Sequence, residues 1–420
     1  MNSLLSKVFE VLQQNNIRYC LLRDGERLSQ KGWGGEIDLL VDPEQFDLLR
    51  QTLAKLGFIP LPNLGHAPHH FFLSYDPIID TWLKLDIVNE LAFGRPIRFL
   101  GTSLAENCLD HRRRLGPTFI PSSEDELITL LLHCVLDKGY FSETRKHRLK
   151  ELQTQNVDAV YLSQLLKEYW SSTAQWEWLN DVMEQDDWDV LLFEQDEVVT
   201  HLKSRNKFGA LFKVVSAKIL RKVSKSISWL SGMSGVSLAL LAPDGAGKST
   251  LSKVIERSFF FPVHQFYMGL YPRENESKPP IKVAGYGFAM RFLRVWMHYL
   301  TAKYFLALGH FVVFDRYTYD ALLPACQQLN WKKELKRYLL AHLLPAPDLV
   351  VVLDAPAEQL FARKGEHSVQ VLENQRQGYL QLKSHLPQVT MVDASREIDS
   401  IRREVTSLIW RRYTQKLRSH

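Results

Sequence analysis

The chain has 420 residues, of which 45% are hydrophobic, 11% aromatic and 24% charged. These values are typical of a globular protein and exclude collagen, coiled coil and long-range disorder, while the length favours two or three domains. Lysine and arginine exceed aspartate and glutamate by 52 to 47, and this net charge of +5 is too small to predict a nucleic-acid partner unless it is clustered.

The sequence carries no pattern typical of a secreted or membrane-spanning protein. Four cysteines lie too far apart for a zinc or disulfide framework: Cys20, Cys108, Cys134 and Cys326. The longest apolar stretch, residues 281–314, is interrupted by basic side chains, and polar residues break up the N-terminal segment. We therefore expect a cytoplasmic protein without a transmembrane helix.

The first part of the chain predicts an α+β arrangement. Apolar residues at helical spacing over 4–14 precede a strand, IRYCLLRD, and GEIDLLVD is a second short strand. FFLSYD and WLKLDIV, separated by a turn near Pro77, predict a hairpin. A cap-like cluster at 122–126 then begins a helical region that continues to about residue 200.

Acidic residues in two of these strands form a candidate metal site. Glu36 and Asp38 alternate with apolar residues, so a strand places both carboxylates on one face. Asp86, in the later strand WLKLDIV, is positioned to supply a third carboxylate. Carboxylates arranged in this way bridge divalent metal ions such as Mg²⁺.

Together these elements are similar to the nucleotidyltransferase fold of the polymerase β type over residues 1–165, particularly its bacterial members with a helical tail. The similarity rests on the order of a helix, a strand, the turn Leu22-Arg23-Asp24-Gly25, a Gly-Gly pair, the acid pair and a distant aspartate. The gap from Gly25 to Glu36 departs from the tighter Gly-Ser arrangement of better known members. The resemblance implies magnesium-dependent nucleotidyl transfer, and the alternative is a degenerate domain that binds a nucleotide or a partner without turnover.

Smaller features of this region have structural interpretations. His133 and Asp137, four apart on an apolar helix, predict a hydrogen-bonded core pair, and a contact from Lys138 to a triphosphate is the alternative. Three histidines of a Pro/Gly loop are expected to be solvated: His66, His69 and His70. Three tryptophans in or near the acidic segment are expected to pack in the core: Trp176, Trp178 and Trp188.

Charge separates sharply between residues 177 and 225. Residues 177–197 contain nine acids and no lysine or arginine, whereas 203–225 contain eight bases and no acid. The basic run also has one apolar face, which predicts an amphipathic helix. We expect it to pack between domains, with a membrane-surface role as the alternative. The predicted domains are 1–200, a basic helix and linker over 201–234, and 235–420.

A phosphate-binding loop begins the last domain. VSLALLAPDGAGKST is an apolar strand followed by a Walker A pattern, with alanine in place of the first glycine. In such a loop the backbone N–H groups surround phosphate oxygens, Lys248 reaches the β and γ phosphates, and Ser249 holds Mg²⁺. The predicted nucleotide-binding residues are Asp244, Gly245, Ala246, Gly247, Lys248, Ser249 and Thr250.

Two later strands end in residues suited to phosphoryl transfer. HFVVFDRY ends with Asp315 and Arg316, where a carboxylate orients magnesium and an arginine binds a phosphate. PDLVVVLD ends at Asp354 and is followed by Arg363 and Lys364, which suit a lid that closes on the transferring phosphoryl group.

Residues 236–413 resemble the thymidylate kinase family of nucleoside monophosphate kinases. The matching pieces are PDGAGKST, the Asp-Arg-Tyr triplet, PDLVVVLD, the lid, ENQRQGYLQL with VDAS, and an arginine 21 residues before the triplet, Arg294. The resemblance implies that Arg294 holds the acceptor phosphate, Asp244 contacts the acceptor's sugar hydroxyl, and residues 393–395 border the adenine. Gly245 stands where some members carry an arginine, so Arg363 or Lys364 would supply that charge.

Other segments depart from that family. YMGLYPREN replaces an Arg-Glu-Pro segment, Met290 stands at the position of a base-stacking aromatic, and Asp320 stands where serine is usual. The parts that transfer phosphate are therefore retained, and those that recognise thymine are not.

We expect an α/β protein: an N-terminal α+β nucleotidyltransferase-like domain with a helical tail, and a C-terminal P-loop kinase-like parallel sheet flanked by helices. The expected activity is ATP-dependent phosphotransfer with Mg²⁺, catalysed by Lys248, Asp315, Arg316, Arg294 and Arg363. The expected partner is a small phosphate-bearing acceptor, and the family resemblance makes a dimer plausible. The alternatives are a kinase for a sugar or glycan intermediate and a nucleotide-gated regulatory protein.

Overall fold

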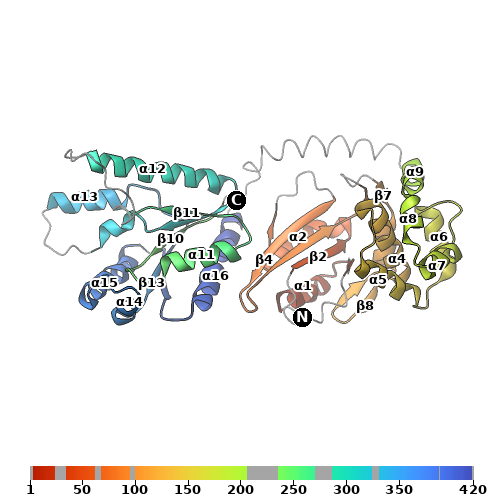
Figure 1. Cartoon of the computed structure of the whole chain (residues 1–420), viewed down its shortest axis with the longest axis horizontal. Coiled ribbons are helices and arrows are strands. Elements are labelled where there is room, and N and C mark those ends of the chain that lie inside the picture. Colours follow the sequence, from red (N-terminus) through yellow and green to blue (C-terminus); the bar gives the residue numbers. More distant parts are fainter. Residues whose placement is uncertain are drawn as a thin grey trace. The chain divides into compact units, whose positions relative to one another are not determined.

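The computed structural model divides the chain into two compact units, residues 1–227 and 228–420 (Figure 1). The structure describes residues 3–23, 35–61, 68–94, 100–205, 235–269, 286–323, 331–386 and 388–418. The predicted basic helix continues beyond Arg205 into residues 206–225, which lie outside the described residues, as do the predicted linker residues 231–234. Among the helices of these ranges, none combines the length and apolarity that a membrane crossing requires.

A five-stranded mixed sheet forms the centre of the N-terminal unit. Its order is β1-β2-β5-β4-β3, and among these pairs only β2 and β5 run parallel. The strands are β1 (Tyr19–Leu21), β2 (Gly35–Val41), β3 (Ile59–Pro60), β4 (His69–Asp76) and β5 (Thr81–Val88). The predicted acid-bearing strand and the predicted hairpin, β4 with β5, are both confirmed. Helices α1 (Ser3–Gln14) and α2 (Phe46–Lys55) supply apolar side chains to the core on this sheet, and the turn η2 (Pro43–Gln45) leads into α2.

Two small hairpins and a helical tail complete this unit. The hairpins pair β6 (Leu91–Phe93) with β7 (Leu100–Thr102) and β8 (Arg113–Leu115) with β9 (Thr118–Ile120), and α3 (Leu104–Asp110) lies between them in the chain. The tail consists of α4 (Ser123–Leu132), the π-helical turn η3 (His133–Lys138), α5 (Glu143–Gln153), α6 (Ala159–Tyr169), α7 (Trp176–Glu184), α8 (Trp188–Phe193) and α9 (Gln195–Arg205). Trp176 and Trp188 are buried in its core and Trp178 packs against it, as predicted.

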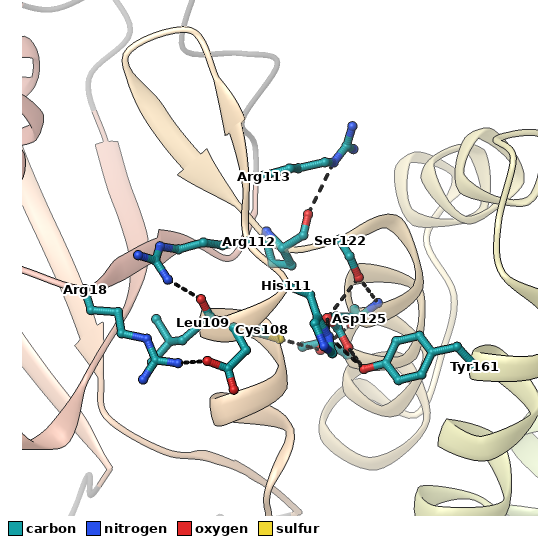
Figure 2. Close-up of polar contacts among 12 residues, drawn as sticks. Arg18, Cys108, Leu109, His111, Arg112, Arg113, Ser122, Asp125 and Tyr161 are labelled. Atoms are coloured by element: carbon teal, nitrogen blue, oxygen red, sulfur yellow. Dashed lines mark hydrogen bonds and ion pairs between the residues drawn. The ribbon is translucent and has the colours of Figure 1, made fainter.

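A buried carboxylate connects the tail to the rest of the unit (Figure 2). Ser122 caps α4 by accepting a hydrogen bond from the backbone N–H of Asp125 at 3.1 Å. The Asp125 side chain, which is fully buried, accepts hydrogen bonds from the Ser122 hydroxyl at 2.9 Å and the Tyr161 hydroxyl at 2.8 Å. The oxygen that accepts from Ser122, Oδ2, also lies 3.2 Å from Nδ1 of His111. An unpaired buried carboxylate would be costly, and the partners that stabilise Asp125 come from three segments. These contacts therefore join α4, α6 and the loop after α3.

The C-terminal unit is a parallel five-stranded sheet in the order β11-β12-β10-β13-β14. Its strands are β10 (Ser237–Leu241), β11 (Val263–Tyr267), β12 (Phe311–Asp315), β13 (Leu349–Asp354) and β14 (Val389–Asp393). The central strand β10 is buried along its whole length, as the apolar run SLALL predicts for a parallel strand covered on both faces.

Helices cover both faces of this sheet. α12 (Tyr286–Ala307) and α15 (Val369–His385) share a core with one face, while α11 (Lys248–Ser258) and α16 (Ile398–Arg418) pack together and contact the sheet (Figure 1). The shorter elements are η5 (Thr318–Leu322), α13 (Trp331–Ala341) and α14 (Ala357–Lys364). This is the predicted P-loop kinase-like arrangement, with the loop after β10 at the carboxyl edge of the sheet.

Candidate functional sites

The P-loop connects the central strand β10 to α11, and its lysine folds back onto it. The Lys248 ammonium donates hydrogen bonds to the carbonyl oxygens of Ala242 at 2.8 Å and Pro243 at 2.9 Å. Burial, together with the positive charge of Arg316, lowers the pKa of Lys248 to about 8. The loop thus holds a buried cation at the N-terminus of α11, which favours an anion.

A cavity of about 500 Å³ lies over this loop. The predicted phosphate-binding residues, from Asp244 to Thr250, line it, and Arg363, Lys364 and Arg396 add positive charge to its lining. Arg363 donates a hydrogen bond to the carbonyl oxygen of Ala394 at 3.0 Å, which ties α14 to the loop after β14. Arg396 was missed by the sequence analysis, although it directly follows VDAS and the residues expected to border the adenine.

Asp315 and Arg316 lie beside the P-loop, as the predicted strand end requires. β12 is the neighbour of β10, with Asp315 in register with Leu240, and the Asp315 side chain is buried. Arg316 has a φ of +64°, a left-handed conformation that costs a residue with a Cβ on the order of 1–3 kcal/mol. Its backbone N–H donates to Leu240, and its side chain turns toward the P-loop residue Asp244.

Two carboxylates neutralise Arg316, which the sequence analysis did not foresee. Its guanidinium donates to Asp244 at 2.7 Å and to Asp320 at 3.3 Å. Asp320 also accepts a hydrogen bond from the Tyr379 hydroxyl at 3.0 Å. Burial raises the pKa of Asp320, and the charge of Arg316 opposes that shift. An anionic ligand that binds Arg316 must therefore compete with the carboxylate of Asp320.

Arg294 projects from α12 toward the end of β11. It donates a hydrogen bond to the carbonyl oxygen of Gly269 at 3.1 Å, and its guanidinium carbon lies 6.0 Å from the centre of the Tyr267 ring. Arg294, Asp315 and Arg316 are not among the residues that line the cavity over the P-loop, so the structure does not bring all the predicted catalytic residues to this one cavity. The side chain of Met290 and residues 270–275 of the YMGLYPREN segment lie outside the described residues.

The three acids predicted in the N-terminal unit converge. Asp38 in β2 is in register with Asp86 in β5, and oxygen atoms of Glu36, Asp38 and Asp86 all lie within 4.8 Å of one another. The parallel pairing of β2 and β5 brings them together although 48 residues separate Asp38 from Asp86. Burial raises the pKa of Asp38, with Arg23 opposing the shift and the two neighbouring carboxylates adding to it. Three clustered carboxylates are a donor set that suits Mg²⁺.

Each acid of this carboxylate cluster also has a basic neighbour. Glu36 accepts a hydrogen bond from Lys84 at 2.9 Å, and Asp38 lies 3.4 Å from Arg23. Nδ1 of His69 lies 2.7 and 2.8 Å from the two oxygens of Asp86. The expectation that His69 and His70 are solvated loop residues is wrong, because both belong to β4 and are partly buried; His66 lies outside the described residues. Pairing of β4 with β5 produces the contact between His69 and Asp86.

Two cavities of the N-terminal unit meet at Arg23, Glu36 and Asp38. The larger, about 670 Å³, is also lined by three arginines that the sequence analysis missed: Arg113, Arg145 and Arg148. Arg145 has a buried Nη1 without a hydrogen-bond partner among the described residues. The smaller cavity, about 180 Å³, includes Asp86 and the predicted pair His133 and Asp137.

Comparison with known proteins finds similarity to thymidylate kinases. No family model matches the chain. It is 25% identical to a probable thymidylate kinase of Thermococcus gammatolerans over 204 residues, 42% of this chain and 96% of the relative. It is likewise 25% identical to a probable thymidylate kinase of Sulfolobus acidocaldarius over 186 residues, 40% of this chain and 92% of the relative. A solved thymidylate kinase of Candida albicans matches 42% of this chain and 91% of its own, with 19% identity and a TM-score of 0.32.

Proposed function

We propose that the C-terminal unit is an ATP-dependent phosphotransferase of the nucleoside monophosphate kinase type. The observation that carries the proposal is the buried Lys248, hydrogen-bonded to its own P-loop beside a cavity that Arg363, Lys364 and Arg396 make positive. The similarity to thymidylate kinases over about 40% of the chain supports a kinase in general.

In this proposal an acceptor oxygen attacks the γ-phosphorus of ATP, and the bond from that phosphorus to the β-phosphate oxygen breaks, releasing ADP. Lys248 leaves the carbonyl oxygens of Ala242 and Pro243 to bind the β and γ phosphates, and backbone N–H groups of the loop bind the remaining oxygens. The Ser249 hydroxyl and the Asp315 carboxylate would hold Mg²⁺, which neutralises phosphate charge. Arg363 is positioned by Ala394 to stabilise charge on the donor side.

The acceptor is proposed to carry a phosphate, with Arg294 and Arg316 as its ligands. Arg316 is already paired with Asp244 and Asp320. A phosphate would have to displace Asp320 or Asp244 from Arg316. A sugar or glycan hydroxyl as the acceptor is the second candidate, and the Asp320–Arg316 contact favours it.

The test measures ADP formation against a panel of nucleoside monophosphates and sugars. Lys248→Ala and Asp315→Asn should each lower turnover by about 10² or more, since each removes a group that stabilises the transferring phosphate or its metal. Lys253→Ala is the matched control, because Lys253 lies one and a half turns further along α11 and outside the cavity lining. Equal turnover in wild type and Lys248→Ala would refute the proposal.

We also propose that the N-terminal unit is a nucleotidyltransferase-like domain that binds Mg²⁺ through Glu36, Asp38 and Asp86. The observation in its favour is the convergence of these carboxylates beside a cavity with several arginines. Asp38→Asn should abolish binding of Mn²⁺ to this unit, measured by electron paramagnetic resonance, whereas Glu44→Gln, an exposed acid elsewhere, should not. Unchanged Mn²⁺ binding in Asp38→Asn would refute it.

We also propose a cytoplasmic location, which is consistent with the sequence. A dimer is proposed from the family resemblance, and α12 offers a stripe of exposed apolar side chains at helical spacing: Leu293, Met297, Leu300 and Tyr304. Sedimentation of wild type and Met297→Lys checks this assignment, because a dimer formed through this face should dissociate in the variant.

A further inference from the structure

The smaller cavity of the N-terminal unit differs from the larger one in size and charge. Its volume of about 180 Å³ is below the roughly 300–1,000 Å³ of pockets that enclose a whole ligand, so it suits one end of a small molecule. Five carboxylates line it, against the cations Arg23 and Lys138 and the two histidines His69 and His133. The carboxylates are Glu36, Asp38, Asp86, Glu90 and Asp137. This balance disfavours a phosphate, so the group that enters the cavity should carry no negative charge.

One histidine in the lining is held in a fixed orientation. His133 begins the π-helical turn η3, and such turns recur at functional sites. Its Nδ1 lies 2.8 Å from one oxygen of Asp137, whose other oxygen accepts a hydrogen bond from the backbone N–H of Gly94 at 2.9 Å. The carboxylate therefore places the ring proton on Nδ1 and leaves Nε2 with a lone pair.

Among the residues that the structure describes, none forms a hydrogen bond with the other ring nitrogen. His133 is 1% exposed, and Nε2 has no hydrogen-bond partner among the described residues. A buried polar atom without a partner costs about 1–3 kcal/mol, and a ligand that donates a hydrogen bond would recover that cost. The predicted core pair of His133 and Asp137 thus exists, but it satisfies only one of the two ring nitrogens.

We propose that this cavity binds the hydroxyl end of an uncharged acceptor molecule and that Nε2 of His133 accepts the hydrogen bond from that hydroxyl. The inference rests on the proposed nucleotidyltransferase-like function and deepens it. In that transfer the acceptor hydroxyl oxygen attacks the α-phosphorus of the nucleoside triphosphate and loses its proton to water. The bond from that phosphorus to the β-phosphate oxygen breaks, which releases pyrophosphate. In this proposal the larger cavity, with its arginines, binds the nucleoside triphosphate. The acceptor hydroxyl binds in the smaller cavity, on the other side of the carboxylate cluster. Arg23, Glu36 and Asp38 line both cavities and form the border between the two substrates.

Burial lowers the pKa of His133 to about 4, although Asp137 opposes the shift. The ring therefore stays neutral near pH 7 and accepts a hydrogen bond instead of donating two.

The experiment uses the full chain carrying Lys248→Ala, so that the P-loop does not consume ATP. Glycerol is the hydroxyl probe, and α-³²P-labelled ATP, CTP, GTP and UTP are supplied with Mg²⁺. His133→Phe should raise the KM for glycerol about tenfold without changing the KM for the nucleotide, because about one hydrogen bond to the acceptor is lost. His133→Gln should restore much of the loss, since its amide oxygen also accepts a hydrogen bond. Asp137→Asn serves as a second variant if His133→Phe does not fold.

A second measurement does not depend on turnover. Nitrogen NMR of ¹⁵N-histidine-labelled protein should show glycerol shifting the Nε2 signal of His133. His201 is the control, because its Nε2 already contacts the carbonyl oxygen of Glu168 at 3.0 Å. Asp38→Asn should retain the shift of His133, since the cavity remains.

The outcomes separate the two hypotheses. If Asp38→Asn abolishes transfer while His133→Phe leaves the KM for glycerol unchanged, the inference is wrong and the nucleotidyltransferase proposal stands. If no nucleotide is transferred, or Asp38→Asn is as active as its parent, that proposal is wrong and the NMR shift decides the inference alone. Absence of a shift at His133 in the presence of glycerol would then overturn it.

Discussion

The two glycines of the P-loop share a backbone conformation but have different surroundings. Their φ angles are +88° at Gly245 and +86° at Gly247, where residues with a Cβ are strained. A Cβ at Gly245 would lie 2.6 Å from the carbonyl oxygen of Leu360 in α14, whereas a Cβ at Gly247 would meet nothing within 4 Å. Alanine at each position therefore separates backbone strain from a collision with α14.

The size of each effect follows from these contacts. Left-handed backbone costs alanine about 1–2 kcal/mol, so Gly247→Ala should lower the free energy of unfolding by that amount. Gly245→Ala carries the same strain and must also displace the backbone of α14, which adds about 1–3 kcal/mol. Any larger side chain at this position would meet the same carbonyl oxygen.

Hydrogen exchange measured by mass spectrometry in increasing guanidinium reports this difference for the C-terminal unit alone. Peptides that span β10 to α11 give the free energy of opening at the P-loop, and peptides of α14 report its displacement. Gly245→Ala should destabilise both sets, and Gly247→Ala mainly the first. Equal losses in the two variants, or undisturbed exchange in α14, would show that the approach of Gly245 to Leu360 does not constrain the loop.

Three further predictions concern the network around each site. Without ligand, the pKa of Lys248 is about 8, and bound phosphates should raise it. The affinity for ATP is then highest below pH 8 and falls as the pH rises through 8, by up to about tenfold per pH unit. Calorimetry from pH 7 to 10 measures this dependence, and an affinity independent of pH would contradict it. Asp320→Ser leaves Arg316 with Asp244 as its carboxylate partner, so the affinity for a nucleoside monophosphate such as dTMP should rise about tenfold. Unchanged or weaker binding in calorimetry would show that Asp320 does not compete with the acceptor phosphate for Arg316. Tyr161→Phe removes a hydrogen bond to the buried Asp125 and should lower the free energy of unfolding of the N-terminal unit in urea by about 1–3 kcal/mol. His111→Phe, at the half-exposed side of the same network, should lower it by less. The reverse order would contradict the role given to Tyr161.

Local sequence patterns were sufficient for most of the elements. The alternation of Glu36 and Asp38 with apolar residues predicted β2, and the cap at Ser122 predicted the start of α4, because both signals depend on neighbours in the chain. The P-loop followed from its glycines and Lys248 for the same reason. Arg396 and the arginines of the 670 Å³ cavity were not recognised, because isolated basic residues look alike in sequence whether they line a cavity or face solvent.

The sequence by itself determined the acid-bearing strands, the strand before the P-loop, the P-loop and the carboxylates of the N-terminal cluster, because periodicity, caps and glycine positions act over a few residues. Only the tertiary structure decided which side chains meet. The pairing of β4 with β5 brought His69 to Asp86, and the packing of α15 brought Tyr379 to Asp320. Contacts between residues far apart in the chain arise from strand register and helix packing, which depend on burying the whole core rather than on any local pattern.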